Sequence, residues 1–317
     1  MRRAVVIGTG AYLPNRIMKN AELPAHLETN SEWIIERTGI EQRHIADTNE
    51  TTSDLGTQAG LQAIKNAGIA ANTIDLVILA TTTPDDTMPS SASKIQHRLG
   101  ITNGAGFDIN AACSGFVYAM SIANSFIVSG QAKRVMVIGA ETYSRILDWQ
   151  DRGTCILFGD GAAAVVLEAQ EGSGTNYDRG VLFSKIHSDG KYEHLIKAEG
   201  TAGLFKMDGK DVFRHAVSKM PAAVEEGLQD LGLSKDAIDW LVPHQANIRI
   251  LNAVAQKLGL ADDKIVATVA KHANTSAASI PLALHEAVSD GRIKQGQIIA
   301  CPALGSGLTW GCTIIRW

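Results

Sequence analysis

The order of predicted strands and helices occurs twice along this 317-residue chain. Short apolar runs rich in β-branched residues alternate with longer segments of helical periodicity. The predicted strands cover residues 4–8, 74–80, 106–110, 134–139, 162–167, 238–243, 264–269, 297–302 and 309–316. The predicted helices include residues 53–67, 90–99, 113–129, 212–231, 247–258 and 276–289. Strands that alternate with helices favour an α/β fold with a largely parallel sheet.

Short stretches of similar sequence mark the repeat. A helix ending at 62–68 precedes Ile-Asp-Leu-Val at 74–77, and a helix ending at 227–232 precedes Ile-Asp-Trp-Leu at 238–241. The offset of about 160 residues indicates two diverged copies of one unit, too few for a solenoid. We therefore expect two pseudo-symmetric halves, residues 1–172 and 173–317. Ligands of α/β sheets bind at loops that follow strand ends, so the site should use loops of both halves.

The charge balance narrows the possible partners. Lys and Arg number 29 and Asp and Glu number 33, which gives a net charge of −4. A net acidic chain has no general attraction for nucleic acid or anionic membrane, so we expect neither as a partner. Any anionic ligand then needs a local basic patch.

Targeting and metal-binding signals are also missing from the sequence. The first apolar run stops at Gly8, too short for a signal-peptide core, and no segment approaches the ~20 apolar residues that span a bilayer. The four cysteines lack C-x-x-C spacing, so we expect neither a metal site nor disulfides. A reducing cytoplasm is the expected compartment.

Cys113 is the first candidate for chemistry. It follows a predicted strand and opens a predicted helix, where the helix dipole and free backbone N–H groups favour a thiolate. A lone cysteine is more often a small buried hydrophobe, and this interpretation is preferred for the other three. Those three lie in apolar strand patterns: Cys155, Cys301 and Cys312.

His244 and Asn274 are the candidates in the second half. His244 follows a predicted strand on a loop, where a single histidine is usually only a surface residue. Asn274 lies just before the helix at 276–289, at the position that we take as the repeat equivalent of Cys113. A plain helix cap is the competing interpretation of Asn274. His272 could compete with His244, but it precedes the helix start and is expected to face solvent.

Three glycine-rich turns have different predicted uses. The turn at 158–162 opens a strand and is expected to serve packing. The turn at 304–308 joins two strands, and its backbone N–H groups could point at a bound carbonyl oxygen. The segment 7–14 lacks the third glycine of a dinucleotide-binding motif and contains Pro14 where a helix should run, so that motif is rejected.

At these residues the chain resembles β-ketoacyl-[acyl-carrier-protein] synthase III of the thiolase-like superfamily, nearly from end to end. The resemblance implies a thiolase-like five-layered αβαβα fold made of two pseudo-symmetric halves, and a homodimer. It also implies a Cys113–His244–Asn274 triad with Cys113 as the nucleophile, so the first half carries the cysteine and the second half the histidine and asparagine. The matching segments are 7–14, 32–34, 37–40, 111–115, 151–154, 158–161, 240–247, 274–279 and 309–311.

The resemblance assigns further residues to substrates. Trp33 and Arg152 would sandwich the adenine of coenzyme A, with Arg37 near its phosphates, and a planar guanidinium and an indole suit a purine. Three basic residues match positions where the family docks the acidic carrier protein: Arg214, Arg249 and Lys257. Without the resemblance these three would be solvated helix faces.

Several positions depart from the family pattern, among them Leu304 and Leu308, where Phe is common. The family often has Gly-Gly-Gly where this chain has Gly305-Ser306-Gly307. The backbone N–H of Ser306 keeps its implied place in the oxyanion hole with that of Cys113, but the Ser306 side chain could narrow the pocket. Met88 stands where a residue of the partner subunit, frequently Phe, closes the acyl pocket. These changes leave the acyl chain length open.

The implied reaction is a decarboxylative condensation that initiates type II fatty acid synthesis. An acyl-CoA acylates Cys113, and malonyl-acyl-carrier-protein then condenses with the acyl group; no metal or redox cofactor is required. A second hypothesis is an acyltransferase or condensing enzyme of secondary metabolism on the same fold. A third is an inactive partner in a heterodimer, against which the intact Cys113, His244 and Asn274 argue.

Overall fold

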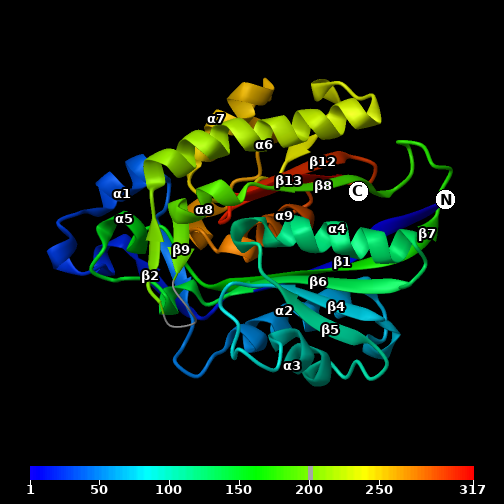
Figure 1. Cartoon of the computed structure of the whole chain (residues 1–317), viewed down its shortest axis with the longest axis horizontal. Helices are drawn as coiled ribbons and strands as arrows, with labels where there is room; N and C mark the ends of the chain where they lie inside the picture. Colours follow the sequence, from blue (N-terminus) through cyan, green and yellow to red (C-terminus); the bar gives the residue numbers. More distant parts are fainter. Residues whose placement is uncertain (199–202) are drawn as a thin grey trace.

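The computed structural model describes residues 1–198 and 203–317 and stacks its elements as helix, sheet, helix, sheet and helix (Figure 1). The first sheet has the order β1-β7-β6-β4-β5 and the second the order β11-β12-β13-β8. The strands of the first are β1 (Arg2–Tyr12), β7 (Gly161–Glu171), β6 (Arg134–Glu141), β4 (Leu76–Ala80) and β5 (Ala105–Ile109). Those of the second are β11 (Trp240–Leu241), β12 (Ile298–Gly305), β13 (Thr309–Arg316) and β8 (Gly180–Ser188).

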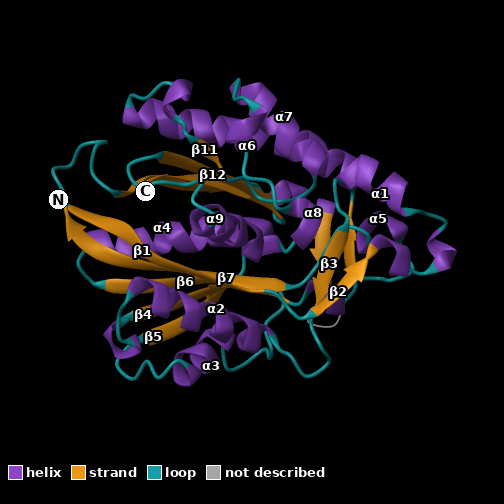
Figure 2. Ribbon diagram, turned by 180° about the vertical axis from the view of Figure 1, so that it is seen from behind, coloured by secondary structure: helices purple, strands orange, loops and turns teal. Residues whose placement is uncertain are grey.

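Helices lie on both outer faces and between the sheets, as Figure 2 shows from behind. The outer layers are α2 (Thr52–Ala67) with α3 (Ser91–Arg98) on one side, and α6 (Gly209–Leu231) with α7 (Ile248–Leu258) on the other. The central layer is α4 (Gly115–Val128) and α9 (Ser279–Ser289). The five-layered α/β fold that the resemblance implied is therefore confirmed.

A smaller lobe lies beside these layers, on the left in Figure 1. Its elements are β2 (Arg16–Lys19), α1 (Ser31–Thr38), β3 (Gln42–Ile45), α5 (Arg152–Cys155) and α8 (Val269–His272). The strands β9 (Ile196–Ala198) and β10 (Phe205–Met207) form a separate antiparallel pair. Sequence periodicity did not predict β2, β3, β8, β9, β10 or α1.

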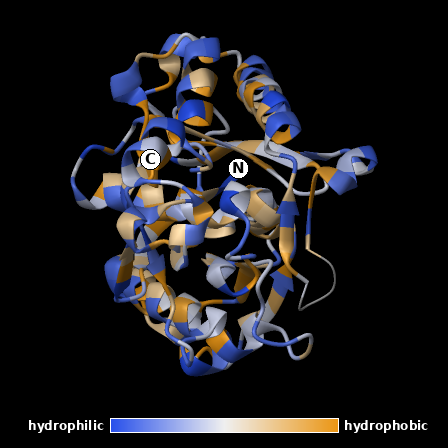
Figure 3. Cartoon of the chain, turned by 90° about the vertical axis from the view of Figure 1, so that its left-hand side faces the viewer, coloured by the Kyte–Doolittle hydropathy of each residue, from blue (hydrophilic) through white to orange (hydrophobic). Residues whose placement is uncertain are grey.

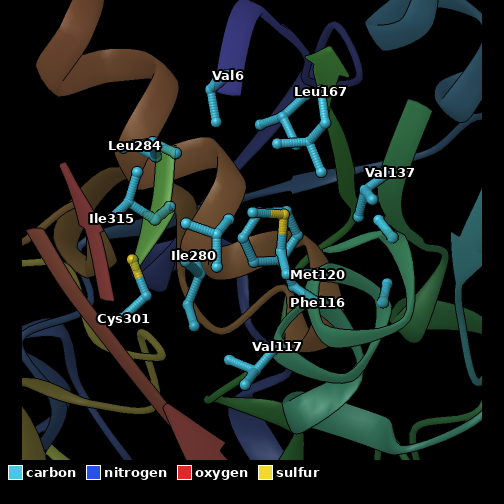
Figure 4. Close-up of a cluster of buried hydrophobic side chains, with 14 of the residues drawn as sticks. Val6, Phe116, Val117, Met120, Val137, Leu167, Ile280, Leu284, Cys301 and Ile315 are labelled. Atoms are coloured by element: carbon cyan, nitrogen blue, oxygen red, sulfur yellow. The ribbon is translucent and has the colours of Figure 1, made fainter. Parts of the chain in front are cut away.

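One large buried cluster lies between the two sheets, and two others lie between each sheet and its outer helices. The central helix α4 is apolar on most of its circumference because it is covered from both sides, and its Phe116 and Met120 are buried. They pack with Ile280 of α9, as Figure 4 shows. The outer helices are instead amphipathic, with hydrophilic residues toward solvent in Figure 3.

Two expectations about the sheets are wrong. Among residues 1–198 and 203–317, parallel strand pairing in the two large sheets is confined to β4–β5, β4–β6 and β11–β12, and their other ladders are antiparallel. The predicted strand 264–269 is reduced to one bridge at Ile265, followed by α8. The buried side chain of Gln245 takes the place of a neighbouring strand there, because it donates to Val266 O (3.0 Å) and accepts from Thr268 N (2.8 Å).

The repeat has a clear structural counterpart. A 3-10 turn precedes each central helix: η4 (Ala112–Ser114) before α4 and η9 (Ser276–Ala278) before α9. The first residue of each turn has a positive φ, 46° at Ala112 and 48° at Ser276. This match makes Ala277 the equivalent of Cys113 and Asn274 the equivalent of Asn110. The expectation that Asn274 is the equivalent of Cys113 is therefore wrong by three residues.

Candidate active site

One cavity of about 440 Å³ brings together the three residues singled out in the sequence. Cys113, His244 and Asn274 all line it, although they come from η4, from the loop after β11 and from the loop between α8 and η9. Its apolar wall includes Phe158, Phe205, Met207, Val212, Phe213, Ala216, Met220 and Leu304. The cavity is thus mainly apolar, with three polar groups of interest and with cationic side chains on its lining, which are Arg37, Lys210 and Arg249.

Cys113 lies in η4, two residues before α4, and its side chain is partly accessible. Two hydrogen bonds fix its backbone against β13: Thr309 Oγ1 donates to Ala111 O (3.1 Å) and Ser114 Oγ donates to Thr309 O (2.9 Å). Burial raises the pKa of the Cys113 thiol to about 12, and the Ser276 hydroxyl lowers it only in part. Burial of this thiol therefore opposes the thiolate that the helix start favours.

Gly305 brings the β12–β13 turn against the nucleophile loop. A Cβ on Gly305 would lie 2.8 Å from Cys113 N and 2.9 Å from Ala111 O. Only glycine permits this close approach of the β12–β13 turn to the nucleophile loop. The Ser306 hydroxyl donates to Ile196 O (2.6 Å) and lines a neighbouring cavity of about 260 Å³ rather than the one that contains Cys113.

His244 is buried at the end of β11 and is uncharged. Its N–H donates to Pro302 O (3.0 Å), which fixes the backbone, and its ring Nδ1 is 2.7 Å from Ser279 Oγ. Gln245 N donates to the same Ser279 oxygen (3.3 Å). When Ser279 donates its proton to Nδ1, the ring proton lies on Nε2. Burial lowers the pKa of His244 to about 3.

Asn274 is held by the glycine-rich turn at 158–162, which therefore does more than packing. Asn274 N donates to Leu157 O (2.9 Å) and Gly159 N donates to Asn274 O (3.1 Å). Its Oδ1 accepts from Ser276 N (2.9 Å), so the side-chain amide remains as a donor. Nearby His272 is buried rather than facing solvent, with Nε2 3.5 Å from Glu286 Oε2.

The residues assigned to coenzyme A gather in the smaller lobe. The guanidinium of Arg37 lies 4.4 Å and that of Arg152 lies 5.2 Å from the Trp33 ring centroid. A base between Trp33 and Arg152 needs about 7 Å, twice the ~3.5 Å contact distance of carbon atoms. Arg152 also donates to Glu28 O (3.0 Å), so its side chain must swing away before an adenine can enter.

The three carrier-protein candidates are exposed on α6 and α7. Arg214 pairs with Asp211 (3.2 Å), and Arg249 lies 5.7 Å from the Phe213 ring and lines the cavity. Lys257 is exposed in the last turn of α7. Met88 is 80% exposed and does not line the cavity of this chain.

The remaining cysteines are buried, as expected, although Cys155 lies in helix α5 rather than in a strand. Figure 4 shows Cys301 within the core. No group of His, Cys, Asp and Glu in residues 1–198 and 203–317 is arranged to hold a metal ion. No helix within those two ranges is long and apolar enough to cross a membrane.

Sequence reasoning missed four side chains around the site. Ser276 and Ser279 lie in the matched segment 274–279, where the triad asparagine drew attention instead. Glu141 is the last residue of β6 and Tyr143 follows that strand, whose apolar pattern gave no sign of a buried carboxyl. The only available signal for these two residues was that both come just after the predicted strand at 134–139.

Comparison with known proteins identifies the family. The models for 3-oxoacyl-[acyl-carrier-protein (ACP)] synthase III and its C-terminal part match residues 107–190 and 228–317. The β-ketoacyl-[acyl-carrier-protein] synthase III of Paramagnetospirillum magneticum is 55% identical over 320 residues, 99% of each chain. The crystal structure of 3-oxoacyl-[acyl-carrier-protein] synthase III from Aquifex aeolicus has a TM-score of 0.95 and 44% identity, over 99% of this chain and 100% of that one. The priming β-ketosynthase from the R1128 polyketide biosynthetic pathway has a TM-score of 0.92 and 33% identity, over 99% and 97%. The chain belongs to the β-ketoacyl-[acyl-carrier-protein] synthase III family of condensing enzymes.

Proposed function

We propose that this enzyme condenses a short acyl-CoA of the acetyl-CoA type with malonyl-acyl-carrier-protein. The products are a 3-oxoacyl-acyl-carrier-protein, coenzyme A and CO2, and the step initiates type II fatty acid synthesis. The observation that carries the proposal is the meeting of a thiol, a neutral imidazole and a carboxamide in one apolar cavity with cationic side chains on its lining.

In the first half-reaction Cys113 sulfur attacks the thioester carbonyl and coenzyme A leaves, so an acyl-enzyme remains. The backbone N–H groups of Cys113 and Ser306 hold the oxyanion, and the Gly305 approach supports this pairing. Trp33, Arg37 and Arg152 bind coenzyme A in the smaller lobe.

In the second half-reaction malonyl-acyl-carrier-protein enters and loses CO2. The Nε2–H of His244 and the amide of Asn274 donate to the thioester oxygen as enolate charge develops there. The carbanion attacks the acyl group on Cys113. Decarboxylation supplies the electron pair, so no group has to remove a carbon-bound proton, and two neutral donors suffice.

Two substitutions separate the half-reactions. Cys113→Ala should abolish acyl transfer from acetyl-CoA, whereas Asn274→Ala should form the acyl-enzyme and lose condensation. Single-turnover acylation and product formation from malonyl-acyl-carrier-protein are measured on the same samples. Full condensation by Cys113→Ala protein would reject the proposal.

A second candidate function is priming in secondary metabolism, or transfer to an oxygen or nitrogen acceptor. The likeness to the polyketide priming β-ketosynthase and the presence of Ser306 favour it. The test compares malonyl-acyl-carrier-protein with malonyl-CoA and small amines as acceptors. Absence of a condensation product with the carrier protein would favour this second function.

We also propose a cytoplasmic homodimer, with two halves divided at residues 172 and 173. β5 is the edge of the first sheet, and an edge strand with partly buried Phe107 and Ile109 suits pairing with a second copy. Met88 would then close the acyl pocket of the partner subunit, and Arg214, Arg249 and Lys257 would dock the carrier protein. Sedimentation of the purified protein tests the dimer, and a monomer would contradict it.

A further inference from the structure

Two charged side chains that the proposed reaction does not use are fully buried against the segment that holds Asn274. Arg43 lies in β3, and Asp160 comes directly before β7. The hydrogen-bond partners of both side chains are uncharged groups. A buried charge without a charged partner is costly, and apolar residues often replace such groups with no loss of stability. Stability alone therefore does not explain these two residues.

Both side chains hold the link between α5 and β7, residues 156–160, which we call the support turn. The support turn makes two backbone hydrogen bonds with Asn274. Asn274 N donates to Leu157 O (2.9 Å), and Gly159 N donates to Asn274 O (3.1 Å). Between them, Phe158 forms a β-bridge with Asn274. The position of the Asn274 side-chain amide therefore depends on the position of the support turn.

Arg43 fixes the first residue of the support turn. Its Nη2 donates to Ile156 O (2.9 Å), and its Nη1 donates to Asn20 Oδ1 (2.9 Å). Asn20 is itself buried and donates from Nδ2 to Ile40 O (2.7 Å), so its side chain is fixed as well. Because the guanidinium is a rigid plane, these bonds tie Ile156 O to the smaller lobe in one orientation.

Asp160 fixes the last residue of the support turn. Its Oδ1 accepts from Ser144 N (2.8 Å), and its Oδ2 accepts from Ala46 N (2.8 Å) and from Ser144 Oγ (2.5 Å). Its backbone N–H donates to His44 O (2.9 Å). Each carboxylate oxygen thus accepts from a backbone N–H, a set of partners that suits a carboxylate and not an amide.

The middle of the support turn is packed tightly between two other elements. A Cβ on Gly159 would lie 3.0 Å from Arg43 Cβ and 3.0 Å from His272 O. Gly159 therefore fits between β3 and α8, which are themselves joined because Glu41 N donates to Ala270 O (3.0 Å). The support turn is thus held at its start, in its middle and at its end.

We propose that Arg43 and Asp160 are positioning residues for condensation, because they fix the support turn that places the Asn274 amide. The other two residues of the site are held by different elements: Cys113 by β13, and His244 by β12 and α9. Loss of Arg43 or Asp160 should therefore affect mainly the step that uses Asn274. The inference rests on the proposed function, in which Asn274 acts in condensation and not in acylation.

The test measures the two half-reactions separately. Acylation is followed by intact mass at saturating acetyl-CoA, and condensation by the product formed when malonyl-acyl-carrier-protein is added to isolated acetyl-enzyme. Asp160→Asn should slow condensation about 10²-fold, the effect of a displacement of about 1 Å, and should change acylation by less than about threefold. Whichever way the new amide is turned, its NH2 group faces the backbone N–H of Ser144 or of Ala46.

A second variant and a matched control accompany Asp160→Asn. Arg43→Met keeps a long apolar side chain and removes the buried charge, so it should fold even if Asp160→Asn does not. It should slow condensation about tenfold and spare acylation. The control is Asp178→Asn, because Asp178 also accepts from backbone N–H groups, those of Ser173 (2.9 Å) and Gly174 (2.7 Å), but in a loop beside Arg3 of β1. It should leave the rates of both half-reactions unchanged.

Two results would overturn the inference. One is condensation by both variants within about threefold of the wild-type rate. The other is an equal slowing of acylation and condensation, which a general loss of structure would cause. If Asn274→Ala protein condenses like the wild type, the proposed role of Asn274 fails instead, so the two failures are distinguishable.

Discussion

Gly305 gives the sharpest test of the proposed oxyanion hole, in which the β12–β13 turn meets the nucleophile loop. In Gly305→Ala the new Cβ would lie 2.8 Å from Cys113 N, 2.9 Å from Ala111 O and 2.9 Å from Ser114 N. All three are backbone atoms, so no side chain can rotate away. Gly305 is not among the glycines with positive φ, so the effect is steric and not one of backbone strain.

The expected magnitude follows from the displacement. Relief of the contacts requires the turn and the nucleophile loop to separate by about 0.6 Å, since normal contact begins near 3.4 Å. Overpacking of this kind costs about 1–3 kcal/mol of unfolding free energy. Displacement of one oxyanion donor lowers the rate by about 10²–10³, so we expect acyl-enzyme formation to slow at least about 10²-fold.

The assay combines urea unfolding with time-resolved intact mass after addition of acetyl-CoA. Gly190→Ala is the control, because its Cβ would meet no atom within 4 Å and it also lacks a positive φ. Gly190→Ala should match the wild type in both measurements. Wild-type acylation and unchanged stability in Gly305→Ala would refute the proposed role of this close approach.

Further predictions concern the histidines, Ser279 and the coenzyme A residues. Burial lowers the pKa of His244 to about 3 and that of His272 to about 4. Between these values and pH 6.5 the unfolded chain therefore binds more protons than the folded chain. The free energy of unfolding, measured with urea, should fall as the pH falls, by about 1.4 kcal/mol per pH unit for each histidine. A stability that stays flat from pH 6.5 to 5 would contradict this. Ser279→Ala removes the hydrogen bond to the His244 ring and should slow condensation about tenfold without slowing acylation. Quenched time-course assays of both steps test this, and an equal loss in acylation and condensation would contradict it. Trp33→Ala and Arg152→Ala should each raise KM for acetyl-CoA about tenfold and leave KM for acetyl-pantetheine, which lacks adenine, unchanged.

The sequence predicted the repeated order of elements and the loops that carry the site. Apolar runs at residues 134–139, 162–167 and 297–302 became β6, β7 and β12, because fully buried strands leave an unmistakable pattern. Strand direction has no such signature. The antiparallel return of β13 depends on the close turn at Ser306, so the expectation of a largely parallel sheet failed.

Other features depend on contacts that periodicity cannot reveal. Segment 264–269 has the residue pattern of a strand, but the Gln245 side chain forms hydrogen bonds with the backbone of Val266 and Thr268. The segment therefore pairs with β11 through a single β-bridge at Ile265. The pKa of Cys113 depends on burial by distant segments, and a helix start in the sequence predicts the opposite direction. The equivalence of Asn274 and Cys113 was wrong by three residues because both come just before a predicted helix, whereas the matching 3-10 turns begin at Ala112 and Ser276.

The most direct test of the account is the site of acylation. Wild-type protein is incubated with acetyl-CoA, its intact mass is recorded, and the modified peptide is mapped. We predict one acetyl group per chain, on the peptide that contains Cys113, and its loss when malonyl-acyl-carrier-protein is added. No acetyl adduct, or an adduct on a different residue that persists in Cys113→Ala protein, would contradict the central claim.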